Sequence, residues 1–508
     1  MAANRCSFPI FPSQRPPRSR SRLPPPPQPA GRVRRPEAST ASRLRGRQPV
    51  TLIVYQNPLH LTPLNPCTQK PPSPMLRAPT GTADVPDDVN PAQWQAINYR
   101  DGHLLIVAGP GTGKTHTLTY RVAHMTANVK PENILAITFT NKAAEEMHER
   151  LHRRIPEAAE EMQIGTFHSF CLQLLRRFID RTGLPPDFTI AAPDEIIELA
   201  RRIWPQHSAS QRRDTLEEIS QWKSRGVTHT TPDLIATYDR TLHDNGMLNL
   251  YDLLRESVRL LRDAEDIGNQ TRRDCRLIFV DEYQDINAAQ HALLRELVQD
   301  DVVITAIGDP NQAIYGFRGA DLRFFRSFET DFMGAATLSL SDNYRSAADI
   351  LTASGQVIEN GDAIDAPDLT ARIYTAGRLT IYETPTDKAE AEYVVHQIEK
   401  MIGSTSMFSQ DFERVERGAE GERTFGDIAV LYRLNSQKAL LEEAFKRSGI
   451  PFQTSGDRPL LEQTGVPEMI AFIRMAGTES VGVGNALRLL RMTITGFGDK
   501  TAKTVGEL

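Results

Sequence analysis

The sequence has little cysteine and no long apolar run, and each shortage narrows the classes of protein to consider. Its four cysteines stand far apart in a chain of 508 residues, at Cys6, Cys67, Cys171 and Cys275. Such scattering indicates neither a disulfide framework nor a zinc cluster. No apolar stretch approaches the length needed to span a bilayer. We therefore expect an ordinary soluble protein of a reducing interior, with no membrane as a partner.

Acidic residues are nearly absent from the first eighty positions. This stretch holds twelve arginines, Lys70 and a single acid, Glu37, so its charge is about +12 and the rest of the chain carries about −17 of the total of −5. It also holds 18 of the 34 prolines and shows no sustained hydrophobic periodicity. A segment of this composition cannot bury a core. We predict a disordered, basic, Pro/Arg-rich tail over residues 1–84.

The role of this tail has more than one interpretation. Arginine-rich, acid-poor N-termini include organelle transit peptides. Proline this dense would break the amphipathic helix that such a peptide needs, which favours a basic tail or a start codon assigned too early. In the latter case Met75 would be the true start. The acidic body does not exclude nucleic acid, because a local basic channel can still neutralise phosphates.

A glycine-rich loop carries the strongest chemical signal. It follows the apolar run 104–107, precedes a predicted helix, and reads Ala108-Gly109-Pro110-Gly111-Thr112-Gly113-Lys114-Thr115. Glycines let consecutive backbone N–H groups point at phosphate oxygens, and a helix N-terminus adds partial positive charge. Lys114 is placed to reach the β- and γ-phosphates, and Thr115 to ligate Mg²⁺. Ala108 replaces the first glycine of the usual spacing and is small enough to fit. The loop predicts binding of a nucleoside triphosphate.

Two acids end a later apolar run, in Leu277-Ile278-Phe279-Val280-Asp281-Glu282-Tyr283-Gln284-Asp285. A buried strand with this ending delivers carboxylates to the carboxyl edge of a parallel sheet, where nucleotides bind. Asp281 suits Mg²⁺ coordination, and Glu282 suits orientation and deprotonation of the attacking water. Acids after a strand often cap the next helix instead. The phosphate loop upstream favours the catalytic interpretation.

Strand-like runs alternate with helical segments, which predicts a parallel sheet with helices on both faces. An N-capped helix begins near Asn90, and the runs span 134–139, 277–280 and 302–307. Residues 185–264 interrupt the pattern as a charge-rich helical insertion without strand runs. After Asn343 a second alternation is predicted, with a strand over 379–383, a helix over 388–401, an exposed loop over 403–424 and a strand over 428–432.

Six motifs together make the chain resemble superfamily 1 DNA helicases of the UvrD/Rep/PcrA type, from about Asn90 to the C-terminus. They stand in the family's order at 108–115, 138–144, 165–169, 281–285, 308–320 and 343–346. The resemblance implies an α/β fold, with a RecA-like P-loop NTPase domain that has a parallel sheet and a helical insertion, followed by an incomplete second RecA-like domain. The implied parts are the first domain over 85–184 and 265–342, its insertion over 185–264, the second domain over 343–458, and the start of a further helical insertion over 459–508.

The resemblance also implies an ATP site. Gln93 is similar to the glutamine that reads the adenine, and Tyr344 to the residue that stacks on the base. Gln312 resembles the γ-phosphate sensor, and Arg345 resembles an arginine finger from the second domain. By spacing alone, a loop cap is the less favoured interpretation of Gln312, whereas without the motif a surface salt bridge would be the favoured interpretation of Arg345. His116 stands where relatives often carry arginine, which leaves a nucleotide contact there open.

For DNA, the resemblance points to aromatic and polar side chains. Phe139 and Phe317 match positions that stack on single-stranded DNA, at about 1–3 kcal/mol per base, and Phe317 stands where tryptophan is common. Thr166 and His168 resemble phosphate contacts, and Arg318 lies beside Phe317. By sequence alone, Phe139 also fits a core position.

The implied activity is that of an ATP-dependent DNA helicase or translocase that uses ATP and Mg²⁺ and moves 3′→5′ on single-stranded DNA. The implied setting is single/double-strand junctions in repair or recombination, in the bacterial cytoplasm or nucleoid. Further motifs of the family's second domain are not found before Leu508, so we expect a truncated chain. Two alternatives stay open: a nucleotide- and DNA-binding module without turnover, and a helicase subunit of a nuclease complex.

Overall fold

The computed structural model describes residues 85–225, 232–299, 301–359, 367–373, 377–402 and 424–454, together with Val466 and Met469. The tail predicted over 1–84 lies outside these ranges. So do residues 403–423 of the predicted loop and, apart from Val466 and Met469, the insertion predicted over 459–508. Among the described residues, no helix is both long and apolar enough to cross a bilayer.

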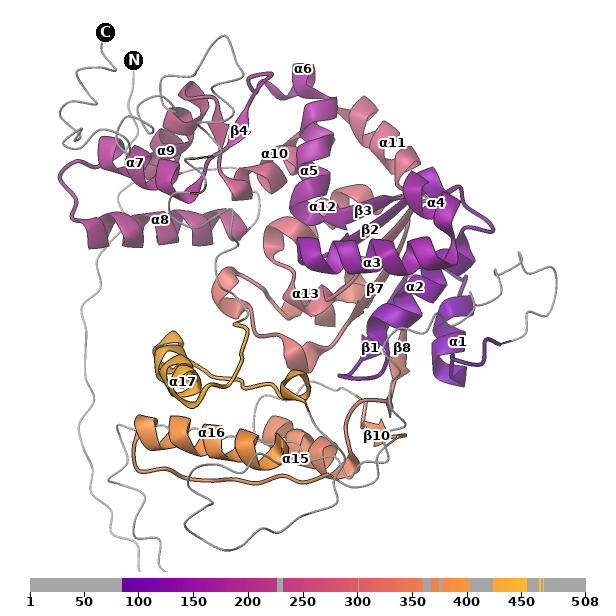
Figure 1. Cartoon of the computed structure of the whole chain (residues 1–508). Coiled ribbons are helices and arrows are strands. Elements are labelled where there is room, and N and C mark those ends of the chain that lie inside the picture. Colours follow the sequence, from indigo (N-terminus) through magenta and orange to yellow (C-terminus); the bar gives the residue numbers. More distant parts are fainter. Residues whose placement is uncertain are drawn as a thin grey trace, which may run out of the picture. The chain divides into compact units, whose positions relative to one another are not determined.

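Six parallel strands form the central sheet, in the order β3-β2-β6-β7-β1-β8 (Figure 1). In chain order they are β1 (Leu104–Ala108), β2 (Ile134–Thr138), β3 (Gln163–Thr166), β6 (Leu277–Val280), β7 (Val303–Gly308) and β8 (Ala336–Leu340). The register aligns Leu104 of β1 with Thr305 of β7 on one side and with Ala336 of β8 on the other. The prediction of an α/β fold built on a parallel sheet is confirmed.

Alternate side chains of the strands build a core on each face of the sheet. Leu104 and Ile106 lie in one core, and Leu105 and Val107 lie in the other. The first core is covered by α1 (Pro91–Asn98), α2 (Lys114–Met125), α3 (Asn141–Arg154) and α4 (Pro156–Glu161). The second is covered mainly by α5 (Phe167–Arg177), α10 (Leu250–Asp263) and α12 (Ala288–Leu297). Both faces are therefore buried, as parallel sheets require.

A helical segment interrupts the sheet-forming sequence after α6 (Ile179–Thr182). Its helices α7 (Pro193–Ile203), α8 (Ala209–Ser224) and α9 (Asp233–Asp244) share an apolar cluster of their own. Lys223 is fully buried, with Nζ 2.5 Å from carboxylate oxygens of Asp239 and Asp252, and so joins α8 to α9 and α10. The expectation of no strands in this region is wrong, because β4 (Thr189–Ile190) pairs with β5 (Met247–Leu248). Strands of two residues are too short to leave an apolar run in the sequence.

Shorter elements connect these parts. They are α11 (Glu265–Asp274), α13 (Arg323–Arg326), α14 (Phe328–Asp331) and the 3-10 turns η1 (Pro131–Asn133), η2 (Tyr283–Asp285), η3 (Pro310–Gln312), η4 (Gly316–Arg318) and η6 (Phe425–Asp427).

The chain after the sheet is mostly helical where it is described. Its elements are β9 (Asp342–Asn343), which pairs in parallel with β10 (Thr370–Ala371), and the helices α15 (Ala348–Glu359), α16 (Asp387–Ile402) and α17 (Asn435–Ser448). The helix predicted over 388–401 is confirmed as α16. The strands predicted over 379–383 and 428–432 are wrong, since both segments are described without strand structure. A strand needs a neighbouring strand for its N–H and C=O groups. Ile381 and Leu431 instead remain 73% and 89% exposed.

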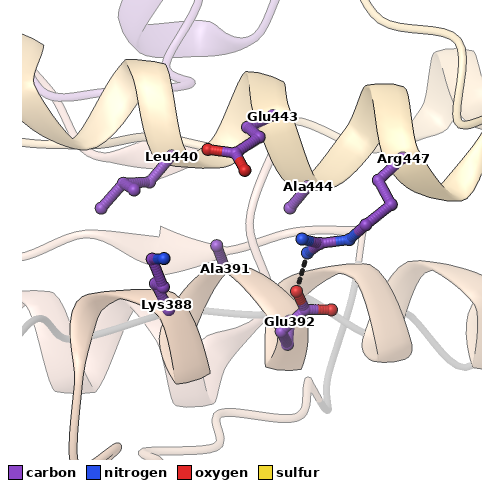
Figure 2. Close-up of a pocket in the computed structure, with 7 residues that line it drawn as sticks. All are labelled: Lys388, Ala391, Glu392, Leu440, Glu443, Ala444 and Arg447. Atoms are coloured by element: carbon purple, nitrogen blue, oxygen red, sulfur yellow. Dashed lines mark hydrogen bonds and ion pairs between the residues drawn. The ribbon is translucent and has the colours of Figure 1, made fainter.

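Helices α16 and α17 pack through apolar side chains such as Val394 and Phe445. Figure 2 shows a pocket between them, with Arg447 of α17 paired to Glu392 of α16. The seven residues that line this pocket include none of the predicted site residues.

Candidate nucleotide and nucleic-acid site

Neighbouring strands bring the predicted chemistry to one edge of the sheet. The phosphate loop follows β1, Phe139 follows β2, Asp281 follows β6 and Asp309 follows β7. These four strands are adjacent and parallel, in the order β2-β6-β7-β1. Because the carboxyl ends of parallel strands meet at one edge, the four groups belong to the same site.

The phosphate loop has the backbone conformation that its glycines allow. Gly111 and Gly113 have φ angles of 71° and 84°, in the left-handed region that favours glycine. Gly113 is the N-cap of α2, which begins at Lys114. The Lys114 Nζ donates to the carbonyl oxygen of Ala108 at 3.4 Å, so the ammonium group folds back over the loop. Backbone N–H groups, a helix N-terminus and a lysine are thus gathered as phosphate binding requires.

Gln93 lies against this loop from the side of α1. Its Nε2 donates to the carbonyl oxygen of Thr112 at 3.0 Å, and its Oε1 accepts the N–H of Asn90 at 2.9 Å in a capping box. A Cβ at Gly113 would lie 2.8 Å from the Gln93 Nε2. His116, in the first turn of α2, contacts the carbonyl oxygen of Asp88 at 3.1 Å through Nε2. The proposed base-reading glutamine is therefore beside the loop.

Asp281 and Glu282 follow β6 directly. Glu282 has a left-handed backbone conformation, and Asp281 has a raised pKa. Glu282 has a φ of 50° and is the only described residue other than glycine with a positive φ. Its N–H donates to the Asp281 Oδ1 at 2.9 Å. Burial raises the pKa of Asp281 to about 6, the charge of Glu282 adds to this rise, and the charge of Lys114 opposes it. Lys114 also opposes the rise that burial causes in the pKa of Asp309. Lys114 and Glu282 therefore act on both carboxylates.

The oxygen donors at this edge fit a magnesium ion. Asp281 offers a buried carboxylate, and Thr115 offers a hydroxyl at the start of α2. A group of three or more His, Cys, Asp or Glu residues suited to a metal is absent from the described part of the chain. Mg²⁺ is commonly held by one or two carboxylates together with substrate phosphates rather than by an all-protein cage. The donor set matches that mode of binding.

A chain of hydrogen bonds joins Glu282 to Gln312. Gln284, which is only 2% exposed, donates through Nε2 to the Glu282 Oε2 at 2.8 Å. Its Oε1 accepts the backbone N–H of Asp309 at 2.9 Å. The Oδ2 of Asp309 in turn accepts from the Gln312 Nε2 at 2.7 Å. Two residues, Gln284 and Asp309, thus connect the predicted base to the predicted γ-phosphate sensor.

The turn that carries Tyr344 and Arg345 also lies at the phosphate loop. The N–H of Tyr344 donates to the carbonyl oxygen of Gly111 at 2.9 Å, and its hydroxyl accepts from the Asn90 Nδ2 at 2.9 Å. A Cβ at Gly111 would lie 2.6 Å from the Arg345 Cβ. The structure therefore brings both residues beside the loop.

Phe139 just after the end of β2 and two rings of the loop that follows β7, Tyr315 and Phe317, form a row that we call the aromatic stack, in which the first pair is stacked and the second pair is tilted by 49°. The rings of Phe139 and Tyr315 are stacked, with centroids 5.1 Å apart and planes at 26°. Tyr315 also contacts Phe317 at 6.0 Å, and Phe317 is 70% exposed. The guanidinium of Arg318 lies 5.3 Å from the Tyr315 ring and 5.6 Å from the Phe317 ring. A row of rings that ends in an exposed one, with an adjacent cation, is the kind of surface that binds single-stranded nucleic acid.

Thr166 and His168 have local roles in the structure. The Thr166 Oγ1 accepts the N–H of Ser169 at 3.2 Å and so caps α5. Burial lowers the pKa of His168, whose Nε2 is buried without a hydrogen-bond partner. Contacts of these two residues with phosphate stay a prediction.

Sequence reasoning missed four members of this site. They are Gln284, Asp309, Tyr315 and Asn343. All four lie inside the motifs quoted from the sequence, next to residues that were assigned a role. For Gln284, Asp309 and Tyr315, the available signal was a position just after a strand end or in the loop that follows; Asn343 is the last residue of the short strand β9 and had only its place in the motif.

Comparison with known proteins gives two family matches that follow one another along the chain. Residues 89–333 match the UvrD/REP helicase N-terminal domain, and residues 338–508 match the UvrD-like helicase C-terminal domain. The chain is 31% identical over 436 residues to the ATP-dependent DNA helicase PcrA of Staphylococcus aureus, covering 82% of this chain and 57% of the relative.

Other relatives give a similar picture. The PcrA of Staphylococcus epidermidis is 31% identical over 437 residues, covering 82% of this chain and 58% of the relative. The chain thus spans a little over half the length of these curated relatives. A structural comparison finds the Pif1 helicase from Candida albicans at 11% identity and a TM-score of 0.27, covering 55% of this chain and 45% of that chain. That likeness is too small to carry an argument.

Proposed function

Because this chain belongs to the UvrD/Rep family of helicases, we propose that it is an ATP-dependent DNA helicase or translocase. The observation that carries the proposal is the shared edge of the sheet. The lysine-bearing loop, the carboxylates at 281–282 and the first ring of the aromatic stack all follow neighbouring strands. A single edge that holds both a hydrolysis site and base-stacking rings would let a change at the first site move the second.

In the proposed nucleotide site, the loop 108–115 binds the triphosphate of ATP through its N–H groups and Lys114. Gln93 and Tyr344 bind the base. Thr115 and Asp281 hold Mg²⁺, which supplies positive charge at the phosphate oxygens when bound. The influence of the Lys114 charge on the pKa of both Asp281 and Asp309 supports this assignment.

In the proposed reaction, Glu282 accepts a proton from the attacking water. The hydrogen bond from Gln284 to the Oε2 of Glu282 supports this role, because it holds the carboxylate in one orientation. Gln312 senses the γ-phosphate. Arg345 neutralises the charge that develops on it, an effect worth roughly 10³–10⁵ in rate where such arginines have been removed.

In the proposed nucleic-acid site, Phe139, Tyr315 and Phe317 stack on the bases of single-stranded DNA while Arg318 contacts the backbone. Thr166 and His168 contact phosphates further along the strand. The stack geometry and the exposure of Phe317 support this assignment. We propose movement in the 3′→5′ direction and action at single/double-strand junctions of repair or recombination intermediates, in the bacterial cytoplasm. The resemblance to the family supports these finer points.

The test is ATP hydrolysis by the 508-residue chain with and without single-stranded DNA. We expect DNA to stimulate hydrolysis. Glu282→Gln should lower kcat at least 100-fold while leaving the affinity for a fluorescent ATP analogue within about threefold, since it removes the base and no phosphate contact. The matched control is Glu265→Gln, at an exposed position on α11, which should hydrolyse ATP like the wild type.

One outcome would favour the binding-module interpretation of the sequence, and two others would narrow or contradict the proposal. Binding of nucleotide and DNA without hydrolysis would identify a binding module. Hydrolysis without strand displacement on a duplex with a 3′ tail would identify a translocase. Displacement that starts only from a 5′ tail would contradict the proposed direction.

A further inference from the structure

Asn343 is a fully buried amide at the junction between β9 and the phosphate loop. Its Nδ2 donates a hydrogen bond to the carbonyl oxygen of Pro110, in that loop. Its Oδ1 accepts the backbone N–H groups of Arg345 at 2.9 Å and Ser346 at 2.7 Å. One side chain therefore holds the turn that carries Arg345 and ties that turn to the phosphate loop.

The backbone around Asn343 strengthens this connection. The N–H of Tyr344 donates to the carbonyl oxygen of Gly111 at 2.9 Å, next to the contact with Pro110. On the other side, the N–H of Arg372 donates to the carbonyl oxygen of Asn343 at 2.9 Å, beyond the β9–β10 pair. The turn is thus fixed both to the loop and to a second strand.

The two segments approach so closely that no side chain fits between them. A Cβ at Gly111 would lie 2.6 Å from both the Asn343 Nδ2 and the Arg345 Cβ. The φ of Gly111, 71°, also favours glycine. Leu369 packs equally closely on the loop, 2.7 Å from a Cβ at Gly109.

We infer that Asn343 is a positioning residue, whose amide sets the position of Arg345 relative to the phosphates held by the loop. This inference rests on the proposed function, because it assigns Arg345 to the γ-phosphate. Only a side chain with a donor and an acceptor on one planar group can make both sets of contacts. The backbone of Arg345 is then fixed to the loop, which limits the positions that its guanidinium can take relative to the phosphates.

The first test replaces Asn343 by serine. In Asn343→Ser, the introduced hydroxyl can still accept the N–H groups of the turn but is too short to donate to Pro110. We expect the kcat of DNA-stimulated hydrolysis to fall about 10- to 100-fold, with KM for ATP changed less than about threefold. Asn343→Asp also removes the donor and gives a second variant if the serine variant does not fold, as judged by circular dichroism.

A double-mutant cycle separates positioning from a purely structural role. If Asn343 acts through Arg345, then Asn343→Ser should lower kcat less than about twofold in an Arg345→Ala background. A full additional 10-fold loss in that background would overturn the inference. So would wild-type kcat in Asn343→Ser.

A binding measurement keeps the inference testable if the wild type does not hydrolyse ATP, which would overturn the proposed function. The readout is the ratio of the affinities for a non-hydrolysable ATP analogue and for ADP. Arg345→Ala should reduce this ratio, because the lost contact is with the γ-phosphate. Asn343→Ser should reduce it to a similar value. An unchanged ratio in the serine variant would overturn the inference independently of turnover.

Discussion

The backbone of Glu282 is strained at the residue that is proposed to do the chemistry. A left-handed conformation costs an ordinary L-residue roughly 1–2 kcal/mol, and Glu282 is the only described residue other than glycine that adopts one. Neighbouring bonds maintain it, from its N–H to the Asp281 Oδ1 and from Gln284 to its carboxylate. Strain of this kind collects where a side chain must be held ready to react.

Asp285 allows us to test how much a buried acid next to Glu282 lowers the free energy of unfolding. Its Oδ1 is buried without a hydrogen-bond partner, and burial followed by the charge of Glu282 raises its pKa to about 6. A folded-state pKa above the unfolded value of about 3.9 means that folding favours the protonated acid. The stabilisation of the fold by protonated Asp285 is complete below pH 4 and is lost as the pH rises through 6. At pH 7 the ionised carboxylate then costs about 1–2 kcal/mol.

We therefore expect Asp285→Asn to raise the free energy of unfolding at pH 7 by about 1–2 kcal/mol. The gain should shrink as the pH is lowered from 6 to 4, because the wild-type acid becomes neutral over that range. Urea unfolding at a series of pH values measures it. Asp101→Asn, at an exposed position, is the control. A gain that is the same at pH 4 and pH 7 would show that Asp285 is not the titrating group.

At the scale of the elements, Arg121 joins three of them around the nucleotide site. Its guanidinium is fully buried and donates to the carbonyl oxygens of Ala96 at 2.8 Å and Tyr99 at 2.7 Å, at the end of α1. Its Nε donates to the Thr305 Oγ1 on β7 at 2.9 Å. Burial lowers the pKa of Arg121 to about 10, so it stays charged at pH 7. The helix of Gln93, the helix of Lys114 and the strand before Asp309 are thus held by one side chain.

Replacing Arg121 should lower the free energy of unfolding through lost hydrogen bonds as well as through lost packing. We expect Arg121→Met to lower the free energy of unfolding by about 3 kcal/mol, since it leaves several buried carbonyl oxygens without a donor. Arg121→Lys should recover part of the loss, because an ammonium group can satisfy fewer of the oxygens. Urea unfolding measures both. Arg176→Met, at an exposed position on α5, should change stability little. Equal stability of Arg121→Met and the wild type would rule out this role for Arg121.

The elements also show what the sequence could and could not predict. The parallel sheet and α16 were predictable because apolar runs and helical periodicity are local properties. The strands expected over 379–383 and 428–432 were wrong, because a strand also depends on a neighbour elsewhere in the chain. The same reason explains why Asn343 and Gln284 were missed. Their roles consist of hydrogen bonds to segments far away in sequence, and no local pattern specifies such partners.

At the scale of the whole molecule, an acidic chain carries a small basic and aromatic surface, which we propose binds nucleic acid. The net charge is −5, yet Arg318 lies beside the rings of Tyr315 and Phe317. This loop belongs to the continuous segment 309–318, which begins at the Asp309 that is hydrogen-bonded to Gln284 and Gln312. The nucleotide site and the stacking rings are therefore joined through a single stretch of backbone.

The salt dependence of DNA affinity should distinguish the contribution of ring stacking from that of charge at this surface. We expect Phe317→Ala to weaken binding of single-stranded DNA about 5- to 150-fold, the value of about 1–3 kcal/mol for one base–ring stack, with the slope of log K against log[salt] unchanged. Arg318→Ala should reduce that slope by about 0.7, the value for one phosphate contact on a single strand. Fluorescence anisotropy of a labelled oligonucleotide over a salt series measures both.

Two further variants test whether the rings act by stacking rather than by folding the loop. Phe317→Trp offers a larger face and should bind at least as tightly as the wild type, while Met333→Ala, at another exposed apolar side chain, should have no effect. If Phe317→Ala instead lowers the salt slope along with the affinity, the ring positions Arg318 and does not stack on a base. The Arg318 guanidinium lies 5.3 Å and 5.6 Å from the centroids of the Tyr315 and Phe317 rings. That outcome would therefore mean that Phe317 supports a phosphate contact of Arg318. Stacking on bases would then have to come from Phe139 and Tyr315.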